Sequence, residues 1–336
     1  YRATPADFRA DGVTARLAAY LTRGEGEAAR HFGHMVLALR RETDRGWRIA
    51  AETLTFPGPE TYPPLTVDEL VPLLDAAGIR RAVVLSAAYM WGSPLRADRF
   101  TDQDEYALVR ADNDWVSRQV ARYPDRLRGF CGVSPLREYA LEEVERCHRD
   151  PHLDGIKLHF ANSGVDLRDP EHVERVRRVF AAANQRRMPV VVHLRTWNIP
   201  YGRELTRLFL DRIVPAAPDI PIQVAHMAAS GPGWEDREAD EALAAFADAA
   251  AAGDPRMRNL WFDLATVVTL NVTPQTAERL AGHIRRLGAH RVVYGSDMAV
   301  AGNPAPRQGW ALVKGLLPLT DRELAAIATN VVPYMR

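Results

Sequence analysis

Cysteine is scarce in this sequence. Cys131 and Cys147 are the only two, and neither stands in a Cys-x-x-Cys pair or a Cys/His cluster. We therefore expect neither a disulfide framework nor a thiolate zinc site. The sequence also lacks a run of about 18 apolar residues, the length that spans a bilayer. We expect no membrane partner.

A net charge is missing as well, because 43 Lys and Arg balance 43 Asp and Glu. Without an excess of positive charge the chain creates no field that would favour nucleic acid. The first residue is Tyr1 and not Met, which is consistent with removal of a leader or an upstream segment. No other feature indicates a compartment, so a cytoplasmic location is the default expectation.

Signs of disorder are absent too. With 47% hydrophobic and 26% charged residues, the chain can bury a sizeable core. Its 336 residues exceed the usual single-domain length. They suit a (β/α)8 barrel, which takes about 250 residues, together with an extra element.

That extra element is expected at the N-terminus. Three β-prone runs, 13–22, 33–41 and 47–56, are separated by turn sequences. They predict a small antiparallel β segment over residues 1–47, and the run 33–41 with its continuation resembles the last strands of a SnoaL-like domain. Three strands alone are marginally stable, so we expect them to pack on the barrel or on a second copy in a homo-oligomer.

From residue 66 onward, predicted strands alternate with predicted helices. Thr66 and Glu69 form a capping box for a helix over 67–77, which Gly78 ends. Strands are predicted to begin at Arg81, Leu127, Asp154, Pro189, Pro221, Leu260 and Arg291, and helices to cover 102–123, 141–149, 170–187, 203–214, 236–252, 276–287 and 321–329. With the run 48–56 as first strand, this alternation predicts a (β/α)8 TIM barrel over residues 48–336. The glycine fingerprint of an open dinucleotide-binding sheet is missing.

Polar side chains lie at the C-terminal ends of four predicted strands. Lys157 and His159 are two residues apart, so both point to the same face. His193, His226 and Asp297 end three later strands. Because such ends converge in a barrel, we expect one constellation. Imidazoles with a carboxylate suit Zn²⁺ or another first-row divalent ion, which lowers the pKa of bound water to about 7.

We assign roles within this constellation as follows. His193, His226 and Asp297 are candidate metal ligands, and Asp297 is also the candidate general base. Lys157 is an electrostatic stabiliser, or a bridging ligand if it is carbamylated. His159 completes the candidate catalytic group.

Three residues are candidates for substrate contacts. His159 and Arg195 share faces with the strand-end residues, and they either bind a substrate carboxylate or are paired within the protein. Trp197 follows the His193 strand, where an aromatic ring either lines the pocket mouth or packs in the structure.

At this point the chain resembles a known family. Residues 74–84, residues 155–159, the strand ends at His193 and His226, and residues 294–297 resemble, in this order, segments of the amidohydrolase superfamily. The resemblance is to the amidohydrolase-related (amidohydrolase 2) family of metal-dependent hydrolases and nonoxidative decarboxylases. It implies a divalent metal, Zn²⁺ first and Fe²⁺ or Mn²⁺ as alternatives.

One departure from the family pattern concerns the first strand. The family has His-x-His there, whereas Glu52 and Leu54 stand at the positions that best align. Glu52 replaces one ligand, since a carboxylate oxygen can bind a divalent ion; or the first strand is missing or altered in this chain; or the site binds no metal.

The resemblance implies a hydrolase that cleaves an amide, lactone or ester-like bond in a small molecule, a carboxylate-bearing one if Arg195 or His159 anchors it. Metal-activated water attacks the carbonyl, and Asp297 acts as the base. A nonoxidative decarboxylase on the same scaffold is one alternative. A catalytically silent binding barrel is the other, because His-x-His is missing.

Overall fold

The computed structural model describes residues 66–94, 101–196, 199–234, 236–298, 303 and 305–336, together with the main chain of four strands within residues 1–65. Contacts divide the chain into two compact units. One holds Tyr1–Leu65, and the other holds Thr66–Met298 with Asn303–Arg336. Each unit is described by itself.

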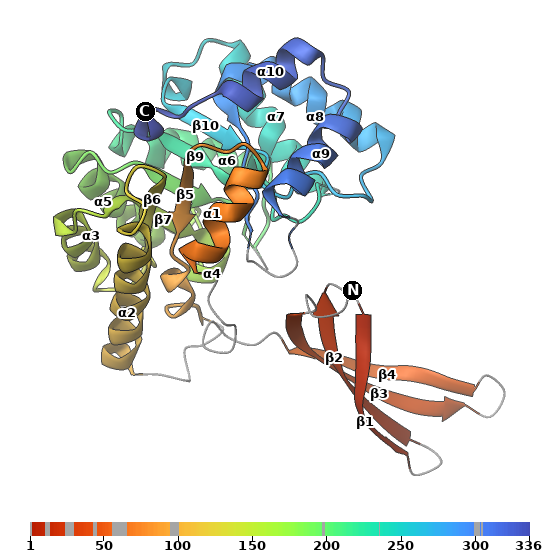
Figure 1. The fold of residues 1–336 in the computed structure, drawn as a ribbon. Helices are drawn as coiled ribbons and strands as arrows, with labels where there is room; N and C mark the ends of the chain where they lie inside the picture. The colour runs from red at the N-terminus through yellow and green to blue at the C-terminus, as the bar shows by residue number, and fades with distance from the viewer. Residues whose placement is uncertain are drawn as a thin grey trace. The chain divides into compact units, whose positions relative to one another are not determined.

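The first unit contains four antiparallel strands in the order β1-β2-β3-β4 (Figure 1). Their bounds are Arg2–Ala10, Thr14–Arg23, Arg30–Glu42 and Gly46–Thr55. The boundary expected between residues 47 and 48 falls inside β4. β4 pairs with β3. The first barrel strand expected over 48–56 stays a prediction.

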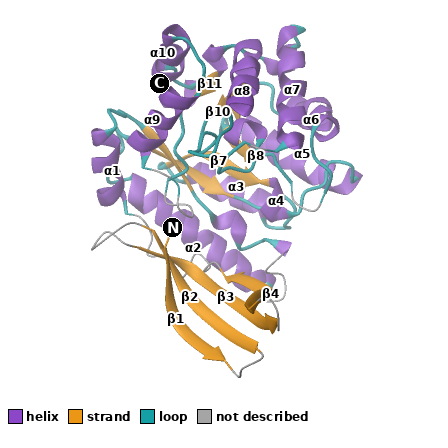
Figure 2. Ribbon diagram, turned by 90° about the vertical axis from the view of Figure 1, so that its right-hand side faces the viewer, coloured by secondary structure: helices purple, strands orange, loops and turns teal. Residues whose placement is uncertain are grey.

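The second unit is built on seven parallel strands in the order β11-β10-β9-β8-β7-β6-β5. Their bounds are Ala82–Leu85 (β5), Leu127–Gly132 (β6), Leu153–His159 (β7), Val190–His193 (β8), Ile222–Val224 (β9), Leu260–Asp263 (β10) and Val292–Val293 (β11). Each of the seven predicted strand regions overlaps one of them. The sheet is curled and helices surround it (Figure 2), which confirms the α/β class and a TIM-like arrangement.

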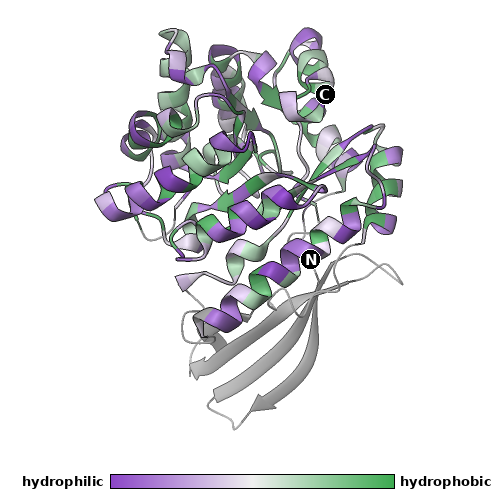
Figure 3. Cartoon of the chain, turned by 90° about the vertical axis from the view of Figure 1, so that its left-hand side faces the viewer, coloured by the Kyte–Doolittle hydropathy of each residue, from purple (hydrophilic) through white to green (hydrophobic). Residues whose placement is uncertain are grey.

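Helices follow the strands in alternation. They are α1 (Val67–Ala76), α2 (Asp102–Val120), α3 (Ala140–Arg149), α4 (Phe160–Ser163), α5 (Pro170–Gln185), α6 (Arg203–Leu208), α7 (Arg237–Ala251), α8 (Pro274–Leu287), α9 (Pro306–Leu316) and α10 (Asp321–Thr329). Single helices carry both hydrophobic and hydrophilic surfaces (Figure 3), as expected when one side packs on a sheet. Within the described segments no helix has the length and apolarity to cross a bilayer.

The capping box of α1 is present. Glu69 Oε2 accepts a hydrogen bond from the Thr66 N–H at 3.0 Å. Gly78 follows the helix with a φ of 70°, a left-handed conformation that glycine adopts without steric cost.

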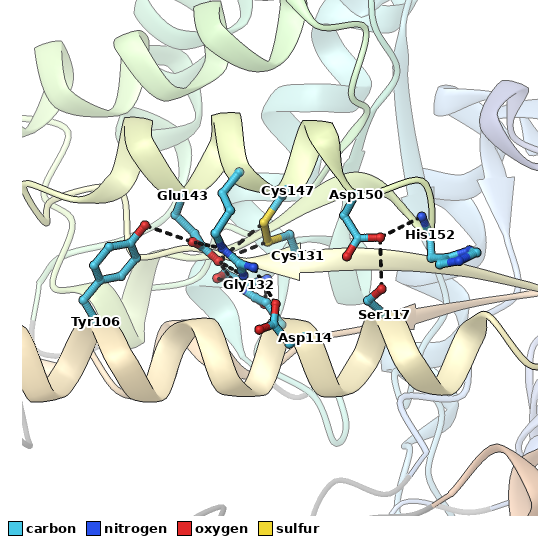
Figure 4. A network of polar contacts seen from close by, with 11 residues as sticks. Tyr106, Asp114, Ser117, Cys131, Gly132, Glu143, Cys147, Asp150 and His152 are labelled. Carbon is cyan, nitrogen blue, oxygen red and sulfur yellow. Dashed lines mark hydrogen bonds and ion pairs between the residues drawn. A yellow bond between two sulfur atoms is a disulfide. The ribbon is translucent and has the colours of Figure 1, made fainter.

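A polar cluster lies between β6, α2 and α3 (Figure 4). At its centre the fully buried Glu143 accepts hydrogen bonds from Asn113 Nδ2 at 2.6 Å and from Arg146 Nη2 at 2.8 Å. Beside it, Cys131 and Cys147 form a disulfide, with 6.4 Å between their Cα atoms. The expectation of no disulfide framework did not include this bond, because no motif marks it and the partners meet only when α3 packs on β6.

Candidate active site

The ends of β7 and β8 place two histidines side by side. Lys157 and His159 point to one face of β7 and are buried, at 5% and 8% exposure. His193 at the end of β8 is the register partner of His159. The two imidazole rings are stacked, with centroids 3.8 Å apart and planes 11° from parallel.

The turn after β9 holds His226 in an unusual conformation. His226, Met227 and Ala228 have φ values of 55°, 49° and 66°, in a one-turn segment called η7 (Ala225–Ala228). Left-handed backbone is unfavourable for residues with a β-carbon, and it persists where surrounding contacts enforce it. The His226 ring lies 5.4 Å from the His193 ring, so the third imidazole joins the other two.

Hydrogen bonds fix both the backbone and the ring of His226. Asp263 Oδ1, at the end of β10, accepts a hydrogen bond from the His226 N–H at 2.9 Å. His226 Nδ1 lies 2.8 Å from the carbonyl oxygen of Ala265. Because a carbonyl only accepts, we assign the proton to Nδ1, and Nε2 then presents its lone pair to the site.

Asp297 comes from the segment after β11. Its φ of 47° is again left-handed. Asn303 Nδ2 donates to its carbonyl oxygen at 2.7 Å and to its carboxylate Oδ2 at 2.9 Å. The backbone is therefore bent and held at the point where this carboxylate enters the site.

Burial and neighbouring charges shift the pKa values of Lys157 and Asp297 in opposite directions. Burial lowers the pKa of Lys157 to about 8, although the carboxylates of Asp297 and Asp263 act in the opposite direction. Burial also raises the pKa of Asp297; His226 and Lys157 oppose this shift, whereas Asp263 adds to it. A lysine flanked by two carboxylates in a buried site is a typical arrangement of functional centres.

The stacked histidines favour their neutral forms. Burial, followed by the neighbouring His193, Lys157 and His226, lowers the pKa of His159 well below its usual value. Burial, His226 and Lys157 do the same for His193. Neutral imidazole is the form that ligates metals.

Arg195 occupies a different environment. Its Nε donates to Asp236 at 2.8 Å, and its Nη2 lies 2.7 Å from a Glu238 carboxylate oxygen. Its guanidinium also lies 4.9 Å from the centre of the Tyr201 ring. This is the pairing within the protein that the sequence left open as an alternative. Glu52 and Trp197 lie outside the residues whose side chains the structure describes.

Two further residues of the cluster were not among the candidates from the sequence. Tyr89, in the turn η3 (Ala88–Met90) after β5, has its ring 4.9 Å from the His159 ring. Asp263 is 4% exposed and holds the His226 turn. One feature of the sequence marks this cluster. Lys157 and Lys314 are the only lysines in an arginine-rich sequence, so a lysine inside a predicted strand is exceptional.

The donor set fits a divalent metal. His193 Nδ1 is buried without a hydrogen-bond partner among the described residues, as a nitrogen awaiting a ligand would be. His226 Nδ1 is held by a carbonyl, the usual outer contact of a metal-binding imidazole. Among the described residues, one group of three has donor atoms that all lie within 4.8 Å of one another: Cys131, Glu143 and Cys147. The two sulfurs of that group are bonded to each other, and the group is not the histidine cluster.

Comparison with solved structures gives the same fold at low identity. The chain is similar to a 2,6-dihydroxybenzoate decarboxylase solved with 2,6-dihydroxybenzoate (16% identity, 79% of this chain and 86% of that chain, TM-score 0.50). It is also similar to 5-carboxyvanillate decarboxylase LigW from Sphingomonas paucimobilis (16%, 78% and 80%, 0.50). A protein described as amidohydrolase II matches with 17% identity over 80% of this chain and 87% of that one, at a TM-score of 0.54.

A family model agrees with these structural matches. The model described as Amidohydrolase (Amidohydro_2) matches residues 68–330. That range includes every described residue of the cluster around Lys157 and His226. The chain therefore belongs to this amidohydrolase family.

Proposed function

We propose that the barrel is a divalent-metal-dependent enzyme that hydrolyses an amide, lactone or ester-like bond in a small molecule. The observation that supports this most is the convergence of three imidazoles, a lysine and two carboxylates at the C-terminal ends of successive parallel strands. Active sites of barrel enzymes lie at this face. The closed (β/α)8 barrel expected over 48–336 is part of the proposal, and the described residues provide seven of its strands.

His193, His226 and Asp297 would hold the ion in this proposal. His193 offers its unpartnered Nδ1, His226 its Nε2, and Asp297 the carboxylate oxygen that Asn303 does not contact. Lys157, if carbamylated, and Glu52 are the further candidate ligands, with Zn²⁺ first and Fe²⁺ or Mn²⁺ as alternatives. When bound, such an ion supplies Lewis acidity and a water of lowered pKa.

The remaining chemistry belongs to the side chains. Asp297 accepts a proton from the attacking water at a carboxylate oxygen, and returns it to the leaving group. The Lys157 ammonium, buried beside this carboxylate, stabilises negative charge that develops on the substrate. His159, stacked on His193, anchors an acidic group of the substrate, with Tyr89 packed against its ring.

Nonoxidative decarboxylation is the second candidate. Two structural neighbours are decarboxylases named after aromatic carboxylates, 2,6-dihydroxybenzoate and 5-carboxyvanillate. On this alternative Asp297 donates a proton to the carbon that loses carbon dioxide. The substrate would then be a small aromatic carboxylate, and His159 would face its acidic group.

Metal content and product analysis test the proposal. We would measure divalent metal in purified protein by elemental mass spectrometry, before and after chelation and reloading with Zn²⁺ or Mn²⁺. The loaded protein is then incubated in H₂¹⁸O with aryl esters, lactones and amides, and separately with 2,6-dihydroxybenzoate and 5-carboxyvanillate. Incorporation of ¹⁸O into a product carboxylate supports hydrolysis, and release of carbon dioxide supports decarboxylation. Protein that binds neither metal would refute both and leave the silent binding barrel.

A further inference from the structure

The C-terminal segment, residues 332–335, packs against the barrel strands. Val332 and Met335 are buried, in a cluster that also includes Val83 of β5 and Val293 of β11. Arg81 Nη1, at the start of β5, donates to the Met335 carbonyl at 2.8 Å. The segment thus contacts both strands that end the seven-stranded sheet.

Tyr334 extends from this segment toward the barrel axis. Its ring lies 5.2 Å from the ring of the fully buried Phe130 of β6. Its hydroxyl donates a hydrogen bond to Gln223 Oε1, on β9, at 2.5 Å. Burial and the Asp263 carboxylate both raise the pKa of Tyr334, so the phenol keeps the proton that it donates.

Gln223 connects this tyrosine to the candidate active site. Its Nε2 donates to Asp263 Oδ2 at 2.7 Å. In the sheet Gln223 is the register partner of Val191 and Trp261, so an amide stands among apolar neighbours. Gln223 is half-buried, and withdrawing an amide from water is costly unless its oxygen and its nitrogen are paired; here Tyr334 and Asp263 pair them.

The other oxygen of Asp263 controls the His226 turn. Oδ1 accepts from the His226 N–H at 2.9 Å and from the Ala265 N–H at 3.1 Å. The Ala265 carbonyl in turn holds His226 Nδ1. An unbroken series of hydrogen bonds therefore runs from the Tyr334 hydroxyl to the imidazole.

We propose that Tyr334 is a positioning residue, which through Gln223 and Asp263 fixes the left-handed backbone and the ring orientation of His226. The proposal rests on the proposed function in one respect, that His226 Nε2 is a ligand. Nothing in the series requires a bound ion, so its structural part can be tested without one. The C-terminal segment then has a role in the site as well as in closing the barrel.

The test uses the full chain with ¹⁵N-labelled histidine, free of metal. Two-dimensional NMR reports which ring nitrogen of each histidine carries the proton, and a His226→Gln variant assigns the His226 signals. The wild type is expected to show the Nδ1-protonated form at His226. Tyr334→Phe, which removes one hydroxyl, is expected to give a mixture of both forms there. Gln223→Met breaks the same series and serves as the second variant should Tyr334→Phe not fold.

Tyr139→Phe is the matched control. It removes a hydroxyl that donates to the Glu105 carboxylate at 2.5 Å, and this pair is not part of the cluster around His226. A titration with Mn²⁺, followed by the electron paramagnetic resonance of the free ion, is the second readout. Tyr334→Phe is expected to weaken binding about tenfold, as outer contacts of metal ligands do, and Tyr139→Phe to leave it unchanged.

The outcomes separate the two proposals. If Tyr334→Phe and Gln223→Met leave the His226 signals at their wild-type positions, the positioning role is refuted, whatever the metal affinity. If those signals change but wild-type protein binds no Mn²⁺ or Zn²⁺, the positioning role stands and the metal-dependent function fails.

Discussion

Two buried polar clusters lie in the same unit, and they differ in how completely their groups are paired. The Glu143 carboxylate accepts hydrogen bonds from Asn113, from Tyr106, and from Nε and Nη2 of Arg146. In the other cluster, His193 Nδ1 is buried without a partner among the described residues. The first is complete without a ligand, whereas the second has a donor atom that a ligand could use.

Backbone conformation differs between the clusters in the same way. Six described non-glycine residues have a positive φ, and five of them follow β9, β10 and β11: His226, Met227, Ala228, Thr266 and Asp297. The sixth, Arg187, follows α5. Residues 131–147 and α2, which together hold the Glu143 cluster, contain none. Strain and incomplete pairing together indicate a functional site, since a cluster that serves stability alone gains nothing from either.

The largest expected effect is on activity, from Asp297→Asn. This change keeps the side-chain shape but removes the proton acceptor, so kcat/KM on the substrate found by the product analysis should fall about 10³-fold. The melting temperature should stay within a few degrees, because a buried charge is removed. Asp321→Asn, in the first turn of α10, is the control and should keep full activity. Full activity in Asp297→Asn would exclude this aspartate from the chemistry.

The next effect is on stability, from Glu143→Ala. Removal of this carboxylate leaves the Arg146 guanidinium and the Asn113 amide without their buried partner, which should cost about 4 kcal/mol in the free energy of unfolding. Urea unfolding measures it. Glu174→Ala, which breaks an exposed pair with Arg177, should cost less than about 1 kcal/mol. Equal losses in the two variants would mean that the Glu143 cluster has no special part in stability.

The pH dependence of the free energy of unfolding tests the burial of Lys157. Its pKa is lowered from 10.5 to about 8 in the folded protein, so the unfolded chain binds more protons between these values. Unfolding free energy therefore rises with pH across this window, and below pH 8 the buried ammonium costs about 3 kcal/mol. In chelated protein Lys157→Met should lack this rise, whereas the exposed Lys314→Met should retain it. Parallel wild-type and Lys157→Met curves would contradict the shift.

Periodic features were predictable from the sequence. The seven strands were located because each lies in a short, mostly apolar run, and Lys157, His159 and His193 because strand side chains alternate. β11 is shorter than expected, two residues against seven, because only Val292 and Val293 pair with β10. α9 was not predicted, since Gly309 and Gly315 weaken its helical pattern.

Features without a period were not predictable. Tyr89 and Tyr334 reach the cluster from a one-turn segment and from the chain end, where no spacing rule applies. Gln223 looked like one polar residue in an apolar run. β1 contains Pro5 and a register shift after it, both of which hide a strand from pattern analysis.

The smallest expected effect comes from Gly231→Ala, which tests the contact between the site and the loop after the His226 turn. Gly231 has a φ of 52°, and an added β-carbon would lie against Thr266 Oγ1 and 3.0 Å from His226 Nδ1. Gly253 has a φ of 69° with nothing within 4 Å of such a carbon. Gly253→Ala should lose about 1 kcal/mol of stability through left-handed strain, and Gly231→Ala should lose more because Thr266 crowds the new carbon, both measured by urea unfolding.

Only Gly231→Ala should also disturb the imidazole. Its Mn²⁺ affinity should fall about tenfold relative to Gly253→Ala, because the β-carbon displaces the ring from the Ala265 carbonyl that orients it. Since the two variants share the strain and differ in these contacts, their difference measures the cost of crowding around His226 and Thr266. Equal affinities would mean that this ring tolerates displacement, and the comparison between a rigidly paired cluster and one prepared for a ligand would then lose its clearest support.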